Sequence, residues 1–225
     1  MLGLRLPLMS TLPLIKIVHS HRRSLALQIE RDGTVIVKAP HLIPKRFIDQ
    51  FILEHQDWID KHSQKIKSAK LSRAEDEYLY LGKKVIFNPG NYTAITIQEE
   101  KLLFPQSLLF RKNKELSNWY INEARRIITQ QVEKYAVLMN TEYKEITFSD
   151  TRSQWGRCTS DNRLQFSWRL VMSPFLVLNY VVIHELAHTM EKNHSQLFWM
   201  KVRNFNPSYR QQIKWLKDHG ATLTL

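Results

Sequence analysis

The stretch that decides the fold is Tyr-Val-Val-Ile-His-Glu-Leu-Ala-His, residues 180–188. The four residues before His184, Tyr-Val-Val-Ile at 180–183, place apolar side chains on nearly every side of a helix, which predicts a helix buried inside the domain. His184 and His188 lie four residues apart, so a helix projects both imidazoles from one face, where they can take two corners of a zinc tetrahedron. Glu185 is turned by about 100° from His184, so its carboxylate can act on a metal-bound water without ligating the metal. The spacing therefore predicts metal-assisted hydrolysis with Glu185 as general base.

A catalytic zinc needs a third protein ligand and leaves its fourth position open for water. His194 is the expected third ligand, because the only carboxylate beyond the predicted helix is Asp218. A helix continued to His194 would carry it about 9 Å past His188 and turn it away, so the helix must end first. We expect Asn193 to stop the helix in the left-handed conformation and Ser195 to cap the next one. The prediction is one Zn2+ per chain, held by three histidines.

The pattern of apolar residues around this helix predicts an α+β fold. An N-terminal antiparallel β-rich part with one helix is followed by a mainly helical half that carries the histidines. Alternating residues over 14–38, with a turn at Asp32-Gly33, predict an antiparallel meander. A single helix should then begin at Pro44 and reach about Lys70. The other elements are expected as strands at 78–87, 93–104, 145–149 and 152–166, and as helices at 113–139, at 173–191, from 195 and after 207.

Two regions are expected along the chain. Residues 1–110 would form the β-rich region with its helix, and residues 111–225 the region with the metal site, either as separate domains or as one continuous domain. A chain of 225 residues is long enough for either arrangement.

Composition and charge restrict the surroundings in which the protein works. The 33 Lys and Arg against 21 Asp and Glu give a net charge of +12, which favours anionic partners such as nucleic acid or nucleotides, with a solvated basic surface as the alternative. The lone Cys158 can form no internal disulfide, and no apolar run reaches the roughly 20 residues that span a bilayer. We therefore expect a cytoplasmic protein with no membrane partner. The oligomeric state is left open.

Several motifs of the second half together resemble the YgjP-like zinc metallopeptidase family, zincins related to the SprT-like proteases. They are Arg-Ser-Gln-Trp-Gly-Arg-Cys at 152–158, Trp-Arg-Leu at 168–170, the stretch at 180–188, Asn-His-Ser at 193–195 and Phe-Trp at 198–199. The resemblance implies a zincin-like C-terminal half, with His184, His188 and His194 as zinc ligands and Glu185 as catalytic base. Two residues depart from the family's pattern and bear on substrate choice: Arg157, where a small residue is usual, and Ser167, where asparagine is usual.

Further residues are candidates for substrate binding. Arg157, Arg163 and Arg169 belong to residues 151–225, where ten Lys and Arg and four Asp and Glu give a net charge of +6. Facing a cleft, these arginines would hold phosphate or an acidic peptide, and otherwise they form a solvated face. Trp155 is expected to pack against the histidine helix or to stack on a substrate ring. Tyr209 is a candidate donor to an oxyanion, or a packing residue.

These observations favour a zinc-dependent hydrolase, foremost a metallopeptidase in which Glu185 activates a zinc-bound water. The first alternative is a metal-dependent nucleoside triphosphate pyrophosphatase, which the +6 charge would suit. The second is a nucleic-acid-associated binding protein with a structural metal, although structural zinc normally has four protein ligands and the sequence offers three good ones. The natural substrate, peptide or nucleotide, and the metal bound in the cell are left open.

Overall fold

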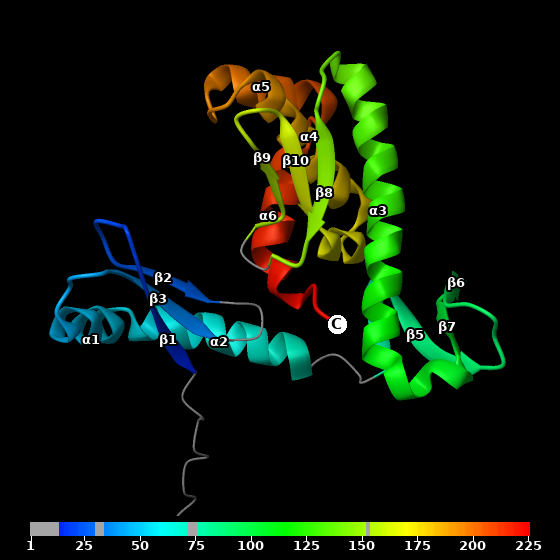
Figure 1. Cartoon of the computed structure of the whole chain (residues 1–225), viewed down its shortest axis with the longest axis horizontal. Coiled ribbons are helices and arrows are strands. Elements are labelled where there is room, and N and C mark those ends of the chain that lie inside the picture. The colour runs from blue at the N-terminus through cyan, green and yellow to red at the C-terminus, as the bar shows by residue number, and fades with distance from the viewer. Residues whose placement is uncertain (1–13, 30–33, 72–75, 152–153) are drawn as a thin grey trace, which may run out of the picture. The chain divides into compact units, whose positions relative to one another are not determined.

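The computed structural model describes residues 14–29, 34–71, 76–151 and 154–225. The chain forms two compact units, Met1–Leu71 and Ser72–Leu225. The fold class is α+β, as predicted, but the N-terminal sheet is mixed and not antiparallel (Figure 1). Within the described ranges, no helix is both long and apolar enough to cross a membrane. The turn expected at Asp32-Gly33 lies outside these ranges.

The first unit contains a three-stranded sheet with β3 (Val35–Pro40) in the middle. β3 pairs in parallel with β1 (Ile15–Ser20) and antiparallel with β2 (Ala26–Ile29). The predicted meander is therefore wrong in the pairing of its first strand. β3 lies in the middle, with Val37 and Ala39 fully buried, whereas β1 is an edge strand whose residues are exposed apart from Ser20.

The single helix expected in this unit is two helices, α1 (Lys45–Glu54) and α2 (Gln56–Leu71). They meet at His55, whose amide donates to the carbonyl oxygen of Ile52 at 3.2 Å and whose Nδ1 lies 2.9 Å from the carbonyl oxygen of Phe51. The tightened turn and the ring bond to the backbone end the first helix at this point.

The second unit begins with a four-stranded sheet that packs on a long helix. α3 (Lys112–Met139) confirms the helix predicted at 113–139. Phe104 of the sheet and Leu116 of α3 belong to one buried cluster, and the Tyr120 hydroxyl donates to the carbonyl oxygen of Leu79 at 2.8 Å. These contacts tie the sheet to α3, and both lie in the compact unit Ser72–Leu225. A domain boundary near residue 110 stays a prediction. In sheet order, the strands are β4 (Glu77–Tyr80), β5 (Lys83–Gly90), β7 (Lys101–Pro105) and β6 (Thr96–Gln98).

A smaller sheet precedes the histidine helix. Its central strand β10 (Arg163–Ser167) pairs in parallel with β8 (Glu145–Ser149) and antiparallel with β9 (Gly156–Cys158). Leu164 and Phe166 of β10 are fully buried, so one face of the sheet belongs to the core. Arg163 and Gln165 lie on the opposite, more exposed face.

Helix α4 (Phe175–Met190) carries the histidine motif and is buried along most of its length, as predicted. It packs against α3, β9, α5 (Gln196–Phe205) and α6 (Tyr209–His219). The turn between β4 and β5 lies against its start: Gly82 has a φ of 81°, and a Cβ there would lie 2.7 Å from Cα of Pro174. Pro174 is the N-cap of α4, and Phe175 is its first helical residue. Short 3-10 helices lie at Gln106–Arg111, Trp168–Met172 and Gly220–Thr222.

Candidate active site

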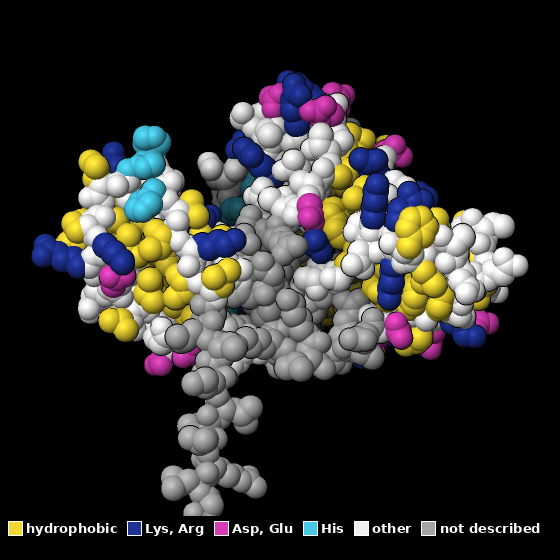
Figure 2. Space-filling model, turned by 60° about the horizontal axis from the view of Figure 1, so that its bottom comes forward, with side chains coloured by type: hydrophobic (Ala, Val, Ile, Leu, Met, Phe, Trp, Pro, Cys, Tyr) yellow, Lys and Arg dark blue, Asp and Glu magenta, His cyan; other side chains and the backbone are white. Residues whose placement is uncertain are grey.

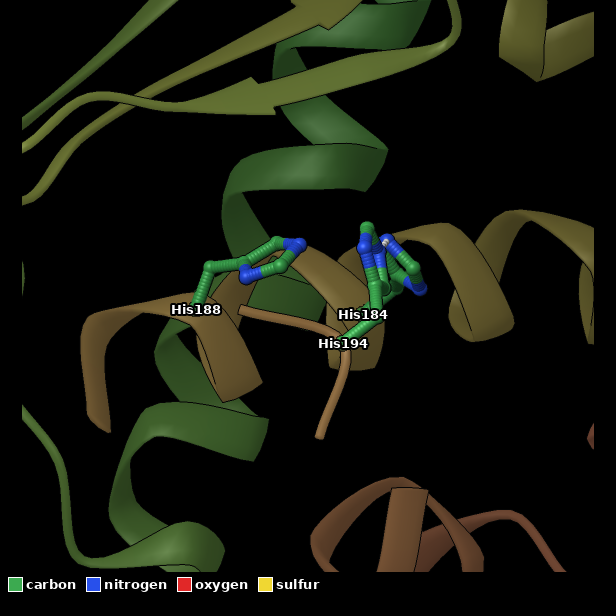
Figure 3. Close-up of side chains that lie close together, drawn as sticks. All are labelled: His184, His188 and His194. Carbon is green, nitrogen blue, oxygen red and sulfur yellow. Dashed lines mark hydrogen bonds between the residues drawn. The ribbon is translucent and has the colours of Figure 1, made fainter. Parts of the chain in front are cut away.

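Three imidazoles converge at the end of α4. His184 and His188 lie one turn apart on the helix, and His194 lies on the loop that follows it (Figure 3). One nitrogen of each ring lies within 4.8 Å of the others, and Nε2 of His194 lies 3.1 Å from Nε2 of His184. Ligand nitrogens on a tetrahedral zinc, each about 2.0–2.1 Å from the metal, are about 3.3 Å apart. The donor type and the spacing therefore fit zinc.

The two helical imidazoles, of His184 and His188, are each oriented by a polar contact at Nδ1. Nδ1 of His188 donates to the carbonyl oxygen of Glu191 at 2.9 Å, which leaves Nε2 unprotonated and able to bind a metal. Nδ1 of His184 lies 3.3 Å from the hydroxyl oxygen of Tyr180. Tyr180 stands four residues before His184, on the same helix face, and this spacing was the signal by which the sequence could have identified it.

Burial keeps the helical imidazoles neutral. It is the main cause that lowers the pKa of His184 to about 3, and the charges of His188 and His194 add to the effect. Burial likewise lowers the pKa of His188. Since neutral imidazole is the form that ligates metals, these two side chains are ready to bind at neutral pH.

The loop after α4 brings His194 back to the helix. α4 ends at Met190, and Glu191 is extended, with φ −132° and ψ 105°. The prediction that Asn193 ends the helix in the left-handed conformation is wrong, because Asn193 does not have a positive φ. The cap expected at Ser195 is confirmed: its side chain accepts the amide N–H of Phe198 at 3.2 Å.

Phe198 forms the floor of the histidine cluster, a role that the sequence analysis missed. It is fully buried, and its ring centroid lies 4.9, 4.4 and 4.8 Å from those of His184, His188 and His194. Beside it, the Trp199 ring stacks on His194 at 5.6 Å. This apolar packing limits the rotamers of the imidazoles and so preorganises them.

Glu185 is next to the first histidine in the sequence and is only 5% exposed. Burial raises the pKa of its carboxyl to about 8, because the charged form is poorly solvated. A cation held by the neighbouring histidines would favour the charged form again. The ability of Glu185 to accept a proton would therefore depend on a cation held at the histidines.

Strand β9 leaves room for this carboxylate through Gly156. A Cβ on Gly156 would lie 2.5 Å from Oε1 and 2.6 Å from Cγ of Glu185, distances that no side chain could keep. Sequence reasoning did not identify this contact, although a glycine inside a strand pattern can mark a close approach of another group. The edge strand and the candidate base are thus in direct contact.

The three candidate arginines do not gather at the histidines. Arg163 bonds Asp161 at 2.8 Å and Glu145 at 2.6 Å on the exposed side of the small sheet. Arg169 is 5% exposed and donates through Nε to Asp150 at 2.9 Å.

Arg157 is exposed and pairs with Gln165 across the β9–β10 ladder. Its neighbour Gly156 faces Glu185, and successive strand residues point to opposite faces, so Arg157 points away from α4. On the face shown in Figure 2, Lys and Arg side chains are interleaved with acidic and apolar ones.

The two aromatic candidates lie in the packing around the site. Trp155 is half-buried, and its ring fills the space that a Cβ on Gly220 would need, at 2.8 Å. Tyr209 is 7% exposed and stacks on Trp199 with centroids 5.1 Å apart. Through Trp199 it belongs to the aromatic stack that supports His194, while its role toward an oxyanion stays a prediction.

Comparison with known proteins points to one family. The model of YgjP-like proteins, described as a metallopeptidase domain, matches residues 23–219. No curated protein matches the sequence. The crystal structure of the metallopeptidase zymogen of Pyrococcus abyssi abylysin aligns with 40% of this chain and 92% of its own, at 15% identity and a TM-score of 0.37.

Proposed function

The chain belongs to the YgjP-like metallopeptidase family, and we propose that it is a zinc-dependent hydrolase of peptide bonds. The observation that carries the proposal is the convergence of His184, His188 and His194 beside a buried glutamate. Three protein ligands leave one position open, as in catalytic zinc sites. A purely structural zinc would need a fourth ligand, and the group found among the described residues contains three.

The histidines would hold one Zn2+, which supplies a Lewis acid that polarises the scissile carbonyl and lowers the pKa of a water molecule toward 7. Glu185 would accept the proton of the attacking water and return it to the leaving amine. Its burial keeps competing solvent away from the carboxylate. Tyr180 and the carbonyl of Glu191 would keep the two helical imidazoles in the ligating orientation.

Strand β9 favours a peptide as the substrate. Among the described residues it pairs only with β10, so its other edge offers unpaired backbone groups beside Glu185. An extended peptide can add to such an edge as a further strand. A nucleotide would need cations at the metal, and Arg163 and Arg169 are held by acidic partners elsewhere. We also propose the cytoplasm as the compartment, since a free Cys158 suits a reducing environment.

Parallel assays test the proposal. Zinc-loaded protein should cleave casein-derived peptides, lose the activity with a chelator and regain it with zinc. Hydrolysis of nucleoside triphosphates without peptide cleavage would favour the pyrophosphatase instead. Activity on neither class, with zinc tightly bound, would favour a binding protein with a structural metal.

A further inference from the structure

Lys192 reaches from the loop after α4 to the turn between β9 and β10. Its ammonium donates to the carbonyl oxygen of Thr159 at 3.0 Å and to Oδ1 of Asn162 at 2.5 Å, and Sγ of Cys158 accepts at 3.8 Å. An ammonium has three N–H donors. The ammonium therefore has as many acceptors as donors, at the end of β9 and in the turn that follows it, although Lys192 is an exposed residue.

The turn that Lys192 holds is itself well ordered by local bonds. The amide of Asn162 donates to the carbonyl oxygen of Thr159 at 3.1 Å. The amide of Thr159 donates to the carbonyl oxygen of Arg163 at 3.0 Å. Asn162 has a φ of 64°, a left-handed conformation that asparagine tolerates. Because β9 runs into this turn, the position of the turn also sets where β9 lies against Glu185.

On its other side, Lys192 is flanked by groups that orient the metal ligands. The carbonyl of the preceding Glu191 accepts the Nδ1 proton of His188 at 2.9 Å. The carbonyl of the following Asn193 accepts the amide of Ser195 at 2.8 Å, and His194 lies between these two residues. The loop is thus held to α4 before Lys192, closed by a turn after it, and joined to the small sheet by Lys192.

We propose that Lys192 is a positioning residue that holds His194 and the edge strand β9 in one frame, so that metal binding and ordering of the β9–β10 turn are coupled. The proposal rests on the metal centre proposed above. The interaction joins the three-donor ammonium to a carbonyl oxygen, an amide oxygen and a thiol.

The charge of Lys192 would act in the opposite direction from its hydrogen bonds. Burial is the main cause that lowers the pKa of His188, and the positive charge of Lys192 contributes to it. A positive charge close enough to lower the pKa of His188 would also repel a metal dication bound to His188. If only the charge mattered, removing it would tighten zinc binding, whereas removing a positioning contact should weaken it.

The experiment measures zinc affinity by competition with a chelator in Lys192→Met, with Lys217→Met, another exposed lysine of the same unit, as the control. We expect Lys192→Met to bind zinc about 10- to 100-fold more weakly, the usual cost of losing an outer contact of a metal site, and Lys217→Met to match wild type. Lys192→Gln, which keeps a donor without the charge, should fall between them. In a His194→Ala background, Lys192→Met should cause no further loss.

Hydrogen exchange of the amides at 158–163 provides a second readout that does not depend on activity. Zinc should protect these amides in wild type and fail to do so in Lys192→Met. The proposal is overturned if Lys192→Met binds zinc as tightly as wild type or more tightly, or if it loses affinity equally in the His194→Ala background. If wild type itself binds no zinc, the metal centre is refuted and this proposal with it.

Discussion

Gly156→Ala tests whether the contact between β9 and Glu185 matters for catalysis. The new Cβ would lie 2.5 Å from Oε1, 2.6 Å from Cγ and 2.8 Å from Cδ of Glu185, against about 3.5–4.0 Å for carbon atoms in contact. The overlap is thus about 1 Å, and a carboxylate that is 5% exposed has little space into which to retreat. We expect overpacking to cost about 1–3 kcal/mol of stability. A base displaced by about 1 Å should cost on the order of a hundredfold in kcat.

The assay compares kcat on a peptide, zinc content and urea unfolding for wild type, Gly156→Ala and Gly90→Ala. Gly90 is the matched control, because a Cβ there would lie 2.7 Å from the ring of Tyr92, far along the chain from the histidines. Both variants should keep one zinc per chain, and only Gly156→Ala should lose kcat. Full activity in Gly156→Ala would refute the reasoning that Glu185 acts from the position seen here.

Three further predictions concern the ligands, the buried carboxyl and the arginines. His194→Ala should retain well below one zinc per chain after dialysis, and unchanged zinc content by elemental analysis would remove His194 from the ligand set. Burial raises the pKa of Glu185 from 4.5 to about 8, so the unfolded chain releases this proton at a lower pH than the folded protein does. The free energy of unfolding of the metal-free protein should therefore fall as the pH rises from about 4.5 to about 8. Glu185→Gln should therefore be more stable than wild type above about pH 8 by up to roughly 5 kcal/mol and about equal near pH 4; a difference independent of pH in urea unfolding would contradict this. Arg169→Ala should lose about 1.5–3 kcal/mol of stability with its bonds to Asp150, whereas Arg157→Ala should stay within about 0.5 kcal/mol, and equal melting temperatures for both would speak against it.

The clustering of the three histidines follows largely from local geometry, which is why the sequence could predict it. A helical repeat puts His184 and His188 on one face whatever the rest of the chain does. His194 follows from the scarcity of other ligands beyond the helix. The path of the loop that carries His194 could not be predicted in this way: the chain leaves the helix through an extended Glu191, and Asn193 is not left-handed as expected. Contacts such as that of Lys192 with a turn some 30 residues earlier in the chain have no local signal.

The features that the sequence could not predict depend on distant pairings. β1 pairs with β3 in parallel, and local alternation of apolar residues does not reveal the direction in which two strands pair. The acidic partners of Arg163 and Arg169 include Glu145 and Asp150, both on or next to another strand. The charges of Arg163 and Arg169 count toward the +6 of residues 151–225, whereas Glu145 and Asp150, which pair with them, lie before residue 151. The need for a glycine at position 156 becomes evident only from the packing of β9 on α4, which brings Glu185 against it.

The most direct test of the central claim compares zinc-loaded wild type with Glu185→Gln on one peptide substrate, with zinc content measured on the same samples. Glutamine keeps the shape of the side chain but cannot accept the proton. Both proteins should hold one zinc per chain, and the variant should be slower by at least about a hundredfold. Equal rates at equal zinc content would contradict the assignment of Glu185 as the base of a zinc hydrolase.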